Sequence, residues 1–185
     1  MKHKIGVYGS AGGNFETILQ KTHELGRVLA ENDVILLTGA STGIPYEVIR
    51  SAANKNAEIW GFSAALDLES QKKLMKGVDT DIFSKLIYIP KDFPFSSNPD
   101  ACKKYRNVIS TATCDGAIII SGRWGAMNEF TNLHDMGKII GVLTGTGGIA
   151  DELESTMSRI KKSSKAKTFF ESDPKTLVEK ILDEL

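Results

Sequence analysis

The sequence predicts an α/β protein built on a doubly wound, Rossmann-like parallel sheet of about seven strands with helices on both faces. Two observations predict this class. Short apolar runs alternate with longer segments of helical spacing, and such alternation implies right-handed crossovers between parallel strands. Several runs, most clearly Ala117–Ile120, are apolar at every position, which is typical of strands covered on both faces.

The expected strands are separated by segments whose apolar residues recur at helical spacing. One stripe runs from Phe15 to Leu29, another from Val48 to Ala53, and a third lies in a helix expected at Asn98–Thr113. Asn98 is a typical N-cap and Pro99 suits the first helical position. The strands are expected at Lys4–Gly9, Val34–Thr38, Glu58–Phe62, Leu86–Pro90, Gly116–Ser121, Ile139–Leu143 and Lys167–Phe170.

Length and composition indicate an ordinary globular protein. The 185 residues suit a single domain spanning 1–185. Acidic and basic residues balance at 23 each, which argues against a nucleic-acid-binding surface. No run is long enough to cross a membrane and we expect no signal peptide. Cys102 and Cys114 fall in one expected helix, without metal-ligand spacing, and we interpret them as reduced thiols of a cytoplasmic protein.

Glycine-rich loops follow four of the expected strands. They are Gly9–Gly13, with Asn14 as the expected cap of the next helix, then Thr38–Gly43, Ser121–Gly125 and Gly145–Gly148. Each such loop alone is most simply a turn, but the carboxyl ends of parallel strands meet at one edge, where ligands bind. Glycine lets backbone N–H groups converge on an anion, and a following helix N-terminus adds partial positive charge. The set therefore predicts a pocket for a phosphate-bearing small molecule.

The absence of two known nucleotide-binding motifs narrows the range of possible ligands. The first loop does not read G-x-G-x-x-G, and no Asp or Glu follows Thr38 to hold a ribose hydroxyl. No glycine loop continues into Gly-Lys-Ser/Thr, so a P-loop is absent. These departures argue against NAD binding and against ATP hydrolysis.

Two ionisable residues are candidates for the chemistry. Glu129 falls on the apolar side of the helix expected after the fifth strand, one turn from its start. It is either an acid that complements the helix dipole or a carboxylate that points into the pocket. Arg106 lies at the margin of the apolar stripe of the Asn98–Thr113 helix and by itself would be a surface arginine.

Four segments resemble the LONELY GUY proteins, which are cytokinin riboside 5′-monophosphate phosphoribohydrolases. Ser121–Glu129 resembles their P-G-G-x-G-T-x-x-E signature and Leu36–Ile44 their glycine-rich segment after the second strand. Gly9–Gly12 resembles the first loop, and Tyr105-Arg106-Asn107 the helix that supplies the family's arginine. The likeness runs from Lys4 to Val142 and extends to a wider superfamily that includes molybdenum cofactor carrier proteins.

Three residues depart from the pattern of the enzymes. Arg123 replaces the second glycine of the signature, Ala126 replaces its threonine, and Asn107 stands where the enzymes usually have lysine. These differences resemble the carrier-type and uncharacterised branch of the superfamily.

The resemblance implies hydrolysis of the N-glycosidic bond of a nucleoside 5′-monophosphate, giving free base and ribose 5-phosphate, with no metal or redox cofactor. Glu129 and Arg106 would be catalytic. The alternative is a non-catalytic carrier or sensor that holds a nucleotide or a molybdopterin-type ligand, and a purely structural partner protein would leave the loops unexplained. A homodimer or higher homo-oligomer is also implied. The residues expected to bind phosphate or nucleotide are Gly9, Ser10, Gly12, Gly39, Ser41, Thr42, Gly43, Ser121, Gly122, Arg123, Trp124, Gly125 and Ala126.

Overall fold

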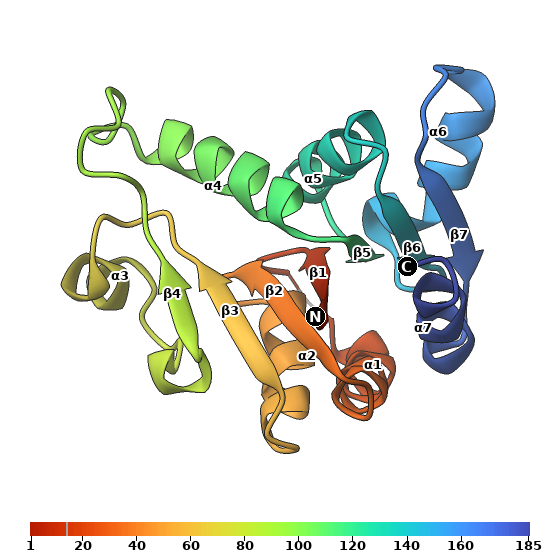
Figure 1. Ribbon diagram of the computed structural model, residues 1–185, viewed down its shortest axis with the longest axis horizontal. Helices are drawn as coiled ribbons and strands as arrows, with labels where there is room; N and C mark the ends of the chain where they lie inside the picture. Colours follow the sequence, from red (N-terminus) through yellow and green to blue (C-terminus); the bar gives the residue numbers. More distant parts are fainter. Residues whose placement is uncertain (14) are drawn as a thin grey trace.

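All strands of the protein form one parallel sheet, seen in the computed structural model, which describes residues 1–13 and 15–185 (Figure 1). The seven strands run in the order β4-β3-β2-β1-β5-β6-β7, as the doubly wound class predicts. Asn14, expected as a helix cap, lies outside the described residues. The strands are β1 (His3–Gly9), β2 (Val34–Gly39), β3 (Glu58–Phe62), β4 (Lys85–Ile87), β5 (Gly116–Ile120), β6 (Ile139–Leu143) and β7 (Lys167–Glu171).

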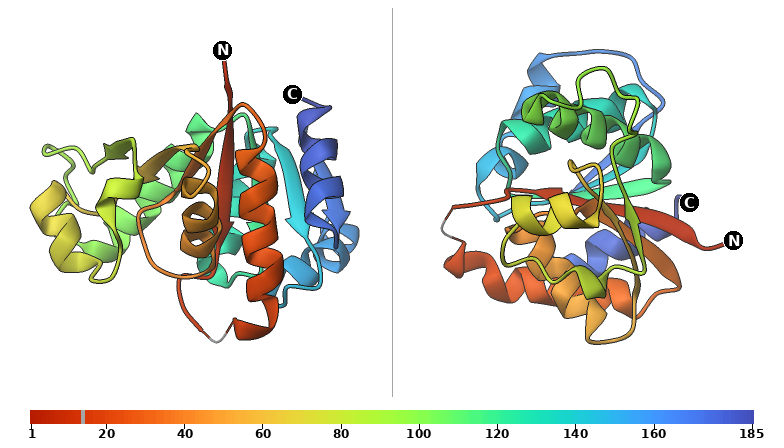
Figure 2. Two further views of the ribbon diagram at one scale, coloured as in Figure 1. Left: turned by 90° about the horizontal axis from the view of Figure 1, so that it is seen from below. Right: turned by 90° about the vertical axis from the view of Figure 1, so that its left-hand side faces the viewer.

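Helices cover both faces of the sheet, as expected (Figure 2). Helices α1, α2 and α7 pack on one face, and α4, α5 and α6 on the other. The α-helices are α1 (Leu19–Ala30), α2 (Ile44–Ala53), α3 (Leu68–Leu74), α4 (Pro99–Thr113), α5 (Trp124–Asp135), α6 (Leu153–Arg159) and α7 (Pro174–Leu182), and short 3₁₀ turns are η1 (Glu16–Ile18), η2 (Thr80–Ile82) and η3 (Gly148–Asp151). Among the described residues, no helix has the length and apolar character needed to cross a membrane.

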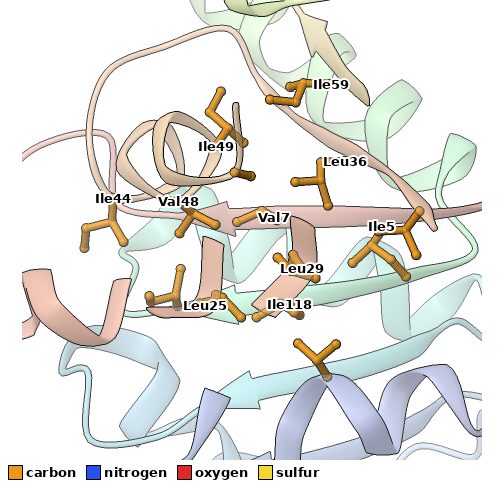
Figure 3. Packing of buried hydrophobic residues seen from close by; sticks show 14 of the residues in the cluster. Ile5, Val7, Leu25, Leu29, Leu36, Ile44, Val48, Ile49, Ile59 and Ile118 are labelled. Atoms are coloured by element: carbon orange, nitrogen blue, oxygen red, sulfur yellow. The ribbon is translucent and has the colours of Figure 1, made fainter. Parts of the chain in front are cut away.

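The continuous apolar runs are explained by the two buried faces. Successive side chains of a strand point to opposite faces. Val7 and Ile118 therefore join the core beneath α1 and α2, visible in Figure 3, whereas Tyr8 and Ile119 join the core beneath α4 and α5. Every position of such a strand meets a hydrophobic layer.

Strand β1 is the centre of the sheet and the point where its winding reverses. It pairs with β2 on one side and with β5 on the other. The chain first builds outward through β3 and β4, then returns to β5 and builds outward in the opposite direction. The loops after β1 and β5 consequently diverge and leave a crevice at the carboxyl edge of the sheet.

The strand boundaries agree with expectation to within one residue except at the edge strand, and the helical stripe expected from Phe15 is divided into η1 and an α1 that begins at Leu19. The run Leu86–Pro90 was expected as a strand, but β4 is limited to Lys85–Ile87, which pairs only with Trp60–Phe62. An edge strand has one neighbour, and Pro90 has no N–H to donate. Asn98 caps α4 as expected, because its side chain accepts hydrogen bonds from the amides of Asp100 and Ala101.

The loops after β1 and β2 are held together by a glycine contact. The amide of Ile44 donates to the carbonyl of Ser10 at 2.9 Å, and the hydroxyl of Thr42 donates to the carbonyl of Ala11 at 3.2 Å. Gly43 has φ +103°, and a Cβ there would lie 2.3 Å from the Ser10 carbonyl oxygen. Only glycine permits this approach.

Replacement of this glycine tests the contact. Gly77 also has a positive φ, of +89°, but a Cβ there meets no atom within 4 Å, so Gly77→Ala introduces backbone strain alone. We expect Gly77→Ala to lower the unfolding free energy by about 1–2 kcal/mol. Gly43→Ala should cost at least about twice as much, because the clash adds to the strain. Urea unfolding of both variants measures the difference, and equal losses would contradict the contact.

Candidate functional site

A pocket of about 400 Å³ opens at the crevice beside β1. The loops after β1 and β2 form one wall, and the N-terminal halves of α4 and α5 form the other. The polar and glycine residues that line it include Gly9, Ser10, Gly39, Ser41, Asp100, Lys103, Lys104, Arg106, Asn107, Arg123, Gly125 and Glu129, with Tyr8, Thr38 and Ala126 at its floor and sides.

Glu129 is a buried carboxyl group that faces this pocket. It lies on the second turn of α5, is 6% exposed and is flanked by the buried Ala126, Phe130 and Leu133. It makes no hydrogen bond or ion pair to any described residue. Burial raises its pKa to about 7, while the nearby positive charges of Arg106 and Lys104 act in the opposite direction. The group therefore titrates near neutral pH, which is characteristic of functional carboxyls.

Arg106 reaches the same pocket from α4. Its guanidinium lies against the backbone of Gly39, where a Cβ would come within 3.0 Å of Nη1. Nη2 donates to Oδ1 of Asn107 at 3.1 Å, and no carboxylate of a described residue lies within 4.0 Å. Burial lowers the pKa of Arg106, and the charges of Glu129 and Tyr8 oppose that shift. Because guanidinium has five N–H donors, Arg106 retains donors for an anion.

A side-chain amide bridge connects the helices that carry these two residues. Asn107 is 3% exposed, and its Nδ2 donates to Oδ1 of Asn128 on α5 at 3.1 Å. Where the enzymes usually have lysine, this chain therefore has a neutral amide, Asn107, that connects α4 to α5. Oδ1 of the same Asn107 accepts from Nη2 of Arg106, so this residue also orients the guanidinium.

The N-terminus of α5 supplies backbone donors to the pocket. No side chain caps it, and the first helical hydrogen bond runs from the amide of Met127 to the carbonyl of Arg123 at 2.9 Å. The amides of Gly125 and Ala126 precede that bond, and both residues line the pocket. Free first-turn amides and the helix dipole favour an anion at this position.

Most of the expected binding residues meet here, and the rest shape the loops. Gly9, Ser10, Gly39, Ser41, Arg123, Gly125 and Ala126 line the pocket together with Glu129 and Arg106. Gly12 lies opposite the Arg123 side chain, and Thr42 and Gly43 join the first two loops.

Ser121, Gly122 and Trp124 are not among the residues that line the pocket. Ser121 accepts a hydrogen bond from the amide of Ala150, and Gly122 accepts one from the amide of Ile149. These two carbonyl groups therefore hold the loop after β5 against η3. The side chain of Trp124 is 83% exposed.

The fourth glycine loop does not contribute to this pocket. The amides of Gly145 and Gly147 donate to the carboxylate of Asp151 at 2.7 and 2.8 Å. Two physical features account for the place of this loop outside the pocket. Its donors already have an anion, and β6 is separated from the crevice by β5.

Sequence reasoning missed the basic rim of the pocket. Lys103 and Lys104 line it from α4, and Asp100 pairs with Lys103 at 3.1 Å. Asp100, Lys103 and Arg106 recur at intervals of three residues, which places them on neighbouring turns of one helix face. This spacing is the sequence feature that indicates a polar face on the helix.

Fold and site together define a Rossmann-like α/β protein with a polar pocket at the reversal of strand order. The model of the SLOG cluster4 family matches residues 2–178. The chain therefore belongs to the SLOG cluster4 family. A comparison with curated proteins finds no significant match.

Solved structures share the fold over the whole chain. The X-ray structure of TM1055 superposes with a TM-score of 0.80 at 17% identity, covering 100% of both chains. The molybdenum cofactor binding protein from Rippkaea orientalis gives 0.71 at 18% identity, covering 100% of this chain and 98% of that one. At these identities the likeness concerns the fold, and the family model alone shows the membership of the SLOG cluster4 family.

A DNA-binding protein also shares the fold. DNA processing protein A from Helicobacter pylori, described with a single-stranded DNA binding mode, superposes with a TM-score of 0.67 at 18% identity. The match covers 98% of this chain and 81% of that one. At such identity the likeness concerns the fold alone, so the absence of a nucleic-acid partner stays a prediction.

The raised pKa of Glu129 makes stability depend on pH. Its folded pKa of about 7 lies above the ordinary value of 4.5, so the folded state holds this proton more tightly than the unfolded state. Its contribution to the unfolding free energy is complete below the ordinary pKa and declines as the pH rises through the folded pKa. We expect a loss of about 3 kcal/mol between about pH 5 and pH 8 that Glu129→Gln does not show.

The measurement is urea unfolding across that pH range for the wild type and Glu129→Gln. Glu31→Gln is the matched control, because Glu31 is exposed at the end of α1 and should retain the wild-type profile. Parallel profiles for wild type and Glu129→Gln would show that Glu129 has an ordinary pKa.

Proposed function

We propose that the protein is an N-glycosyl hydrolase that converts a nucleoside 5′-monophosphate to free base and ribose 5-phosphate. The observation that carries the proposal is the buried, unpaired carboxyl of Glu129 beside Arg106 in the pocket. A site that only held phosphate would gain little from a carboxylate next to an anionic ligand.

The phosphate would bind where the pocket offers donors. The free amides at the start of α5 and the N–H groups of Arg106 are suited to its oxygens. Gly39 leaves the space in which the Arg106 guanidinium lies, because a Cβ there would come within 3.0 Å of Nη1. The base would then extend away from this end of the pocket, with the ribose beside Glu129.

Glu129 would act on the sugar. As the bond from C1′ to the base nitrogen breaks, the base takes the electron pair and positive charge develops on the ribose. An ionised carboxylate stabilises that charge and can orient the water that adds to C1′. The water oxygen becomes the new hydroxyl, and its proton is transferred to the carboxylate or the departing base. This reaction requires no metal or redox cofactor.

A second candidate is binding without turnover. The ligand would be a nucleotide or a molybdopterin-type compound, and the protein would be a carrier or sensor. Two departures from the enzyme signature favour this alternative. Ala126 is buried and has no hydroxyl for phosphate, and Arg123 extends a charge into the pocket at a glycine position.

The first test is release of base from a panel of nucleoside 5′-monophosphates, with ribose 5-phosphate quantified. We expect Glu129→Gln to lower kcat by about 10²–10⁴-fold while ligand affinity is retained. Glu31→Gln should behave as the wild type. Binding by calorimetry with no release by the wild type would reject the hydrolase and support the carrier.

We further propose a homodimer or higher homo-oligomer, in line with the resemblance, through the helices beside the site. Trp124 on α5 and Val108 on α4 are large apolar residues that are 83% and 41% exposed. Light scattering after size exclusion should give at least twice the chain mass, and Trp124→Glu should shift it toward the monomer, because a buried charge is unfavourable. A monomeric wild type would contradict the assembly.

A further inference from the structure

Arg123 crosses the crevice at the centre of the carboxyl edge. It follows β5, and its Nη2 lies 3.8 Å from the position that a Cβ at Gly12 would take. Gly12 belongs to the loop after β1, so the side chain extends from one wall of the crevice to the other. The guanidinium lines the pocket at this position.

This guanidinium has no partner among the described residues. It forms no hydrogen bond to them, and no carboxylate of residues 1–13 or 15–185 lies within 4.0 Å of it. Lys103, by contrast, is paired with Asp100 at 3.1 Å. Arg123 is exposed, so its N–H donors are open to a solute, and a guanidinium can donate to two oxygens of one phosphoryl group.

The unpaired cations of the pocket fall into two groups. Arg106 and Lys104, both on α4, are the cations whose charges act on Glu129, and Arg106 lies against Gly39 at the end of β2. Arg123 lies against the loop after β1 instead. Gly125 and Ala126, in the first turn of α5, line the same pocket as both groups.

We infer that Arg123 forms a second anion subsite beside the one at Arg106 and α5, and that the ligand carries two linked phosphoryl groups. A nucleoside 5′-diphosphate, or a nucleotide extended through a pyrophosphate, has this chemistry. The inference rests on the proposed function for the nucleotide character of the ligand. It keeps the N-glycosidic reaction but changes the preferred substrate from the 5′-monophosphate to the 5′-diphosphate, whose hydrolysis gives free base and ribose 5-diphosphate. Arg123, which stands at a glycine position of the enzyme signature, would then favour a diphosphate over a monophosphate.

The experiment compares matched nucleotide pairs by calorimetry, ADP with AMP and GDP with GMP. The wild type should bind the diphosphate at least about 10-fold more tightly. Arg123→Gly, which restores the glycine of the signature, should bring the two affinities within about 2-fold, mainly by weakening the diphosphate. Arg123→Lys should give an intermediate ratio, because it retains charge without the bidentate geometry.

The matched control is Arg159→Ala, an exposed arginine of α6 that does not line the pocket, and it should keep the wild-type ratio. Circular dichroism verifies that each variant is folded. Equal affinities in the wild type, equal weakening of both ligands by Arg123→Gly, or no nucleotide binding at all would overturn the inference. Diphosphate preference without base release from any nucleotide would reject the hydrolase and leave the second subsite standing.

Discussion

The structure depends on the pairing of β1 with two strands from opposite halves of the chain. β2 flanks β1 on one side and β5 on the other, and this parallel pairing brings residues near 10, 40 and 125 to a common edge. The core on both faces fixes the register, since a slip of one residue would move Val7 and Tyr8 to the wrong hydrophobic layers. The pocket is thus a consequence of how the sheet is wound.

The pocket contains two ionisable side chains, Glu129 and Arg106, whose burial without a charged partner is unfavourable. A buried carboxyl without a hydrogen-bonding partner and a guanidinium without a carboxylate partner both have desolvation costs. The amide bridge from Asn107 to Asn128 holds their helices together without adding charge. Glu129 and Arg106 therefore share one pocket without forming an ion pair, and the charge of Arg106 still acts on the carboxyl. Such incomplete pairing distinguishes this cluster from the surface ion pairs elsewhere on the molecule.

The sequence was sufficient for the fold and for the centre of the site. Uniformly apolar runs such as Ala117–Ile120 admit few interpretations other than central parallel strands, and the spacing of Glu129 among Ala126, Phe130 and Leu133 placed it toward the sheet. Lys103 and Lys104 were not predicted to line the pocket, because their position depends on how α4 packs across the carboxyl edge of the sheet. That packing is set by tertiary contacts. The glycines of the Gly145–Gly148 loop resemble those of the other three loops, but Asp151, a few residues further on, accepts hydrogen bonds from the amides of Gly145 and Gly147.

Because of Asp151, the loops at the carboxyl edge differ in how their backbone amides are satisfied. The loop after β6 has its anion covalently attached, so its order is established when the chain folds and does not vary with solute concentration. No side chain caps the first turn of α5. The amides at one half of the edge are therefore satisfied within the chain, whereas those at the start of α5 stay open to the crevice.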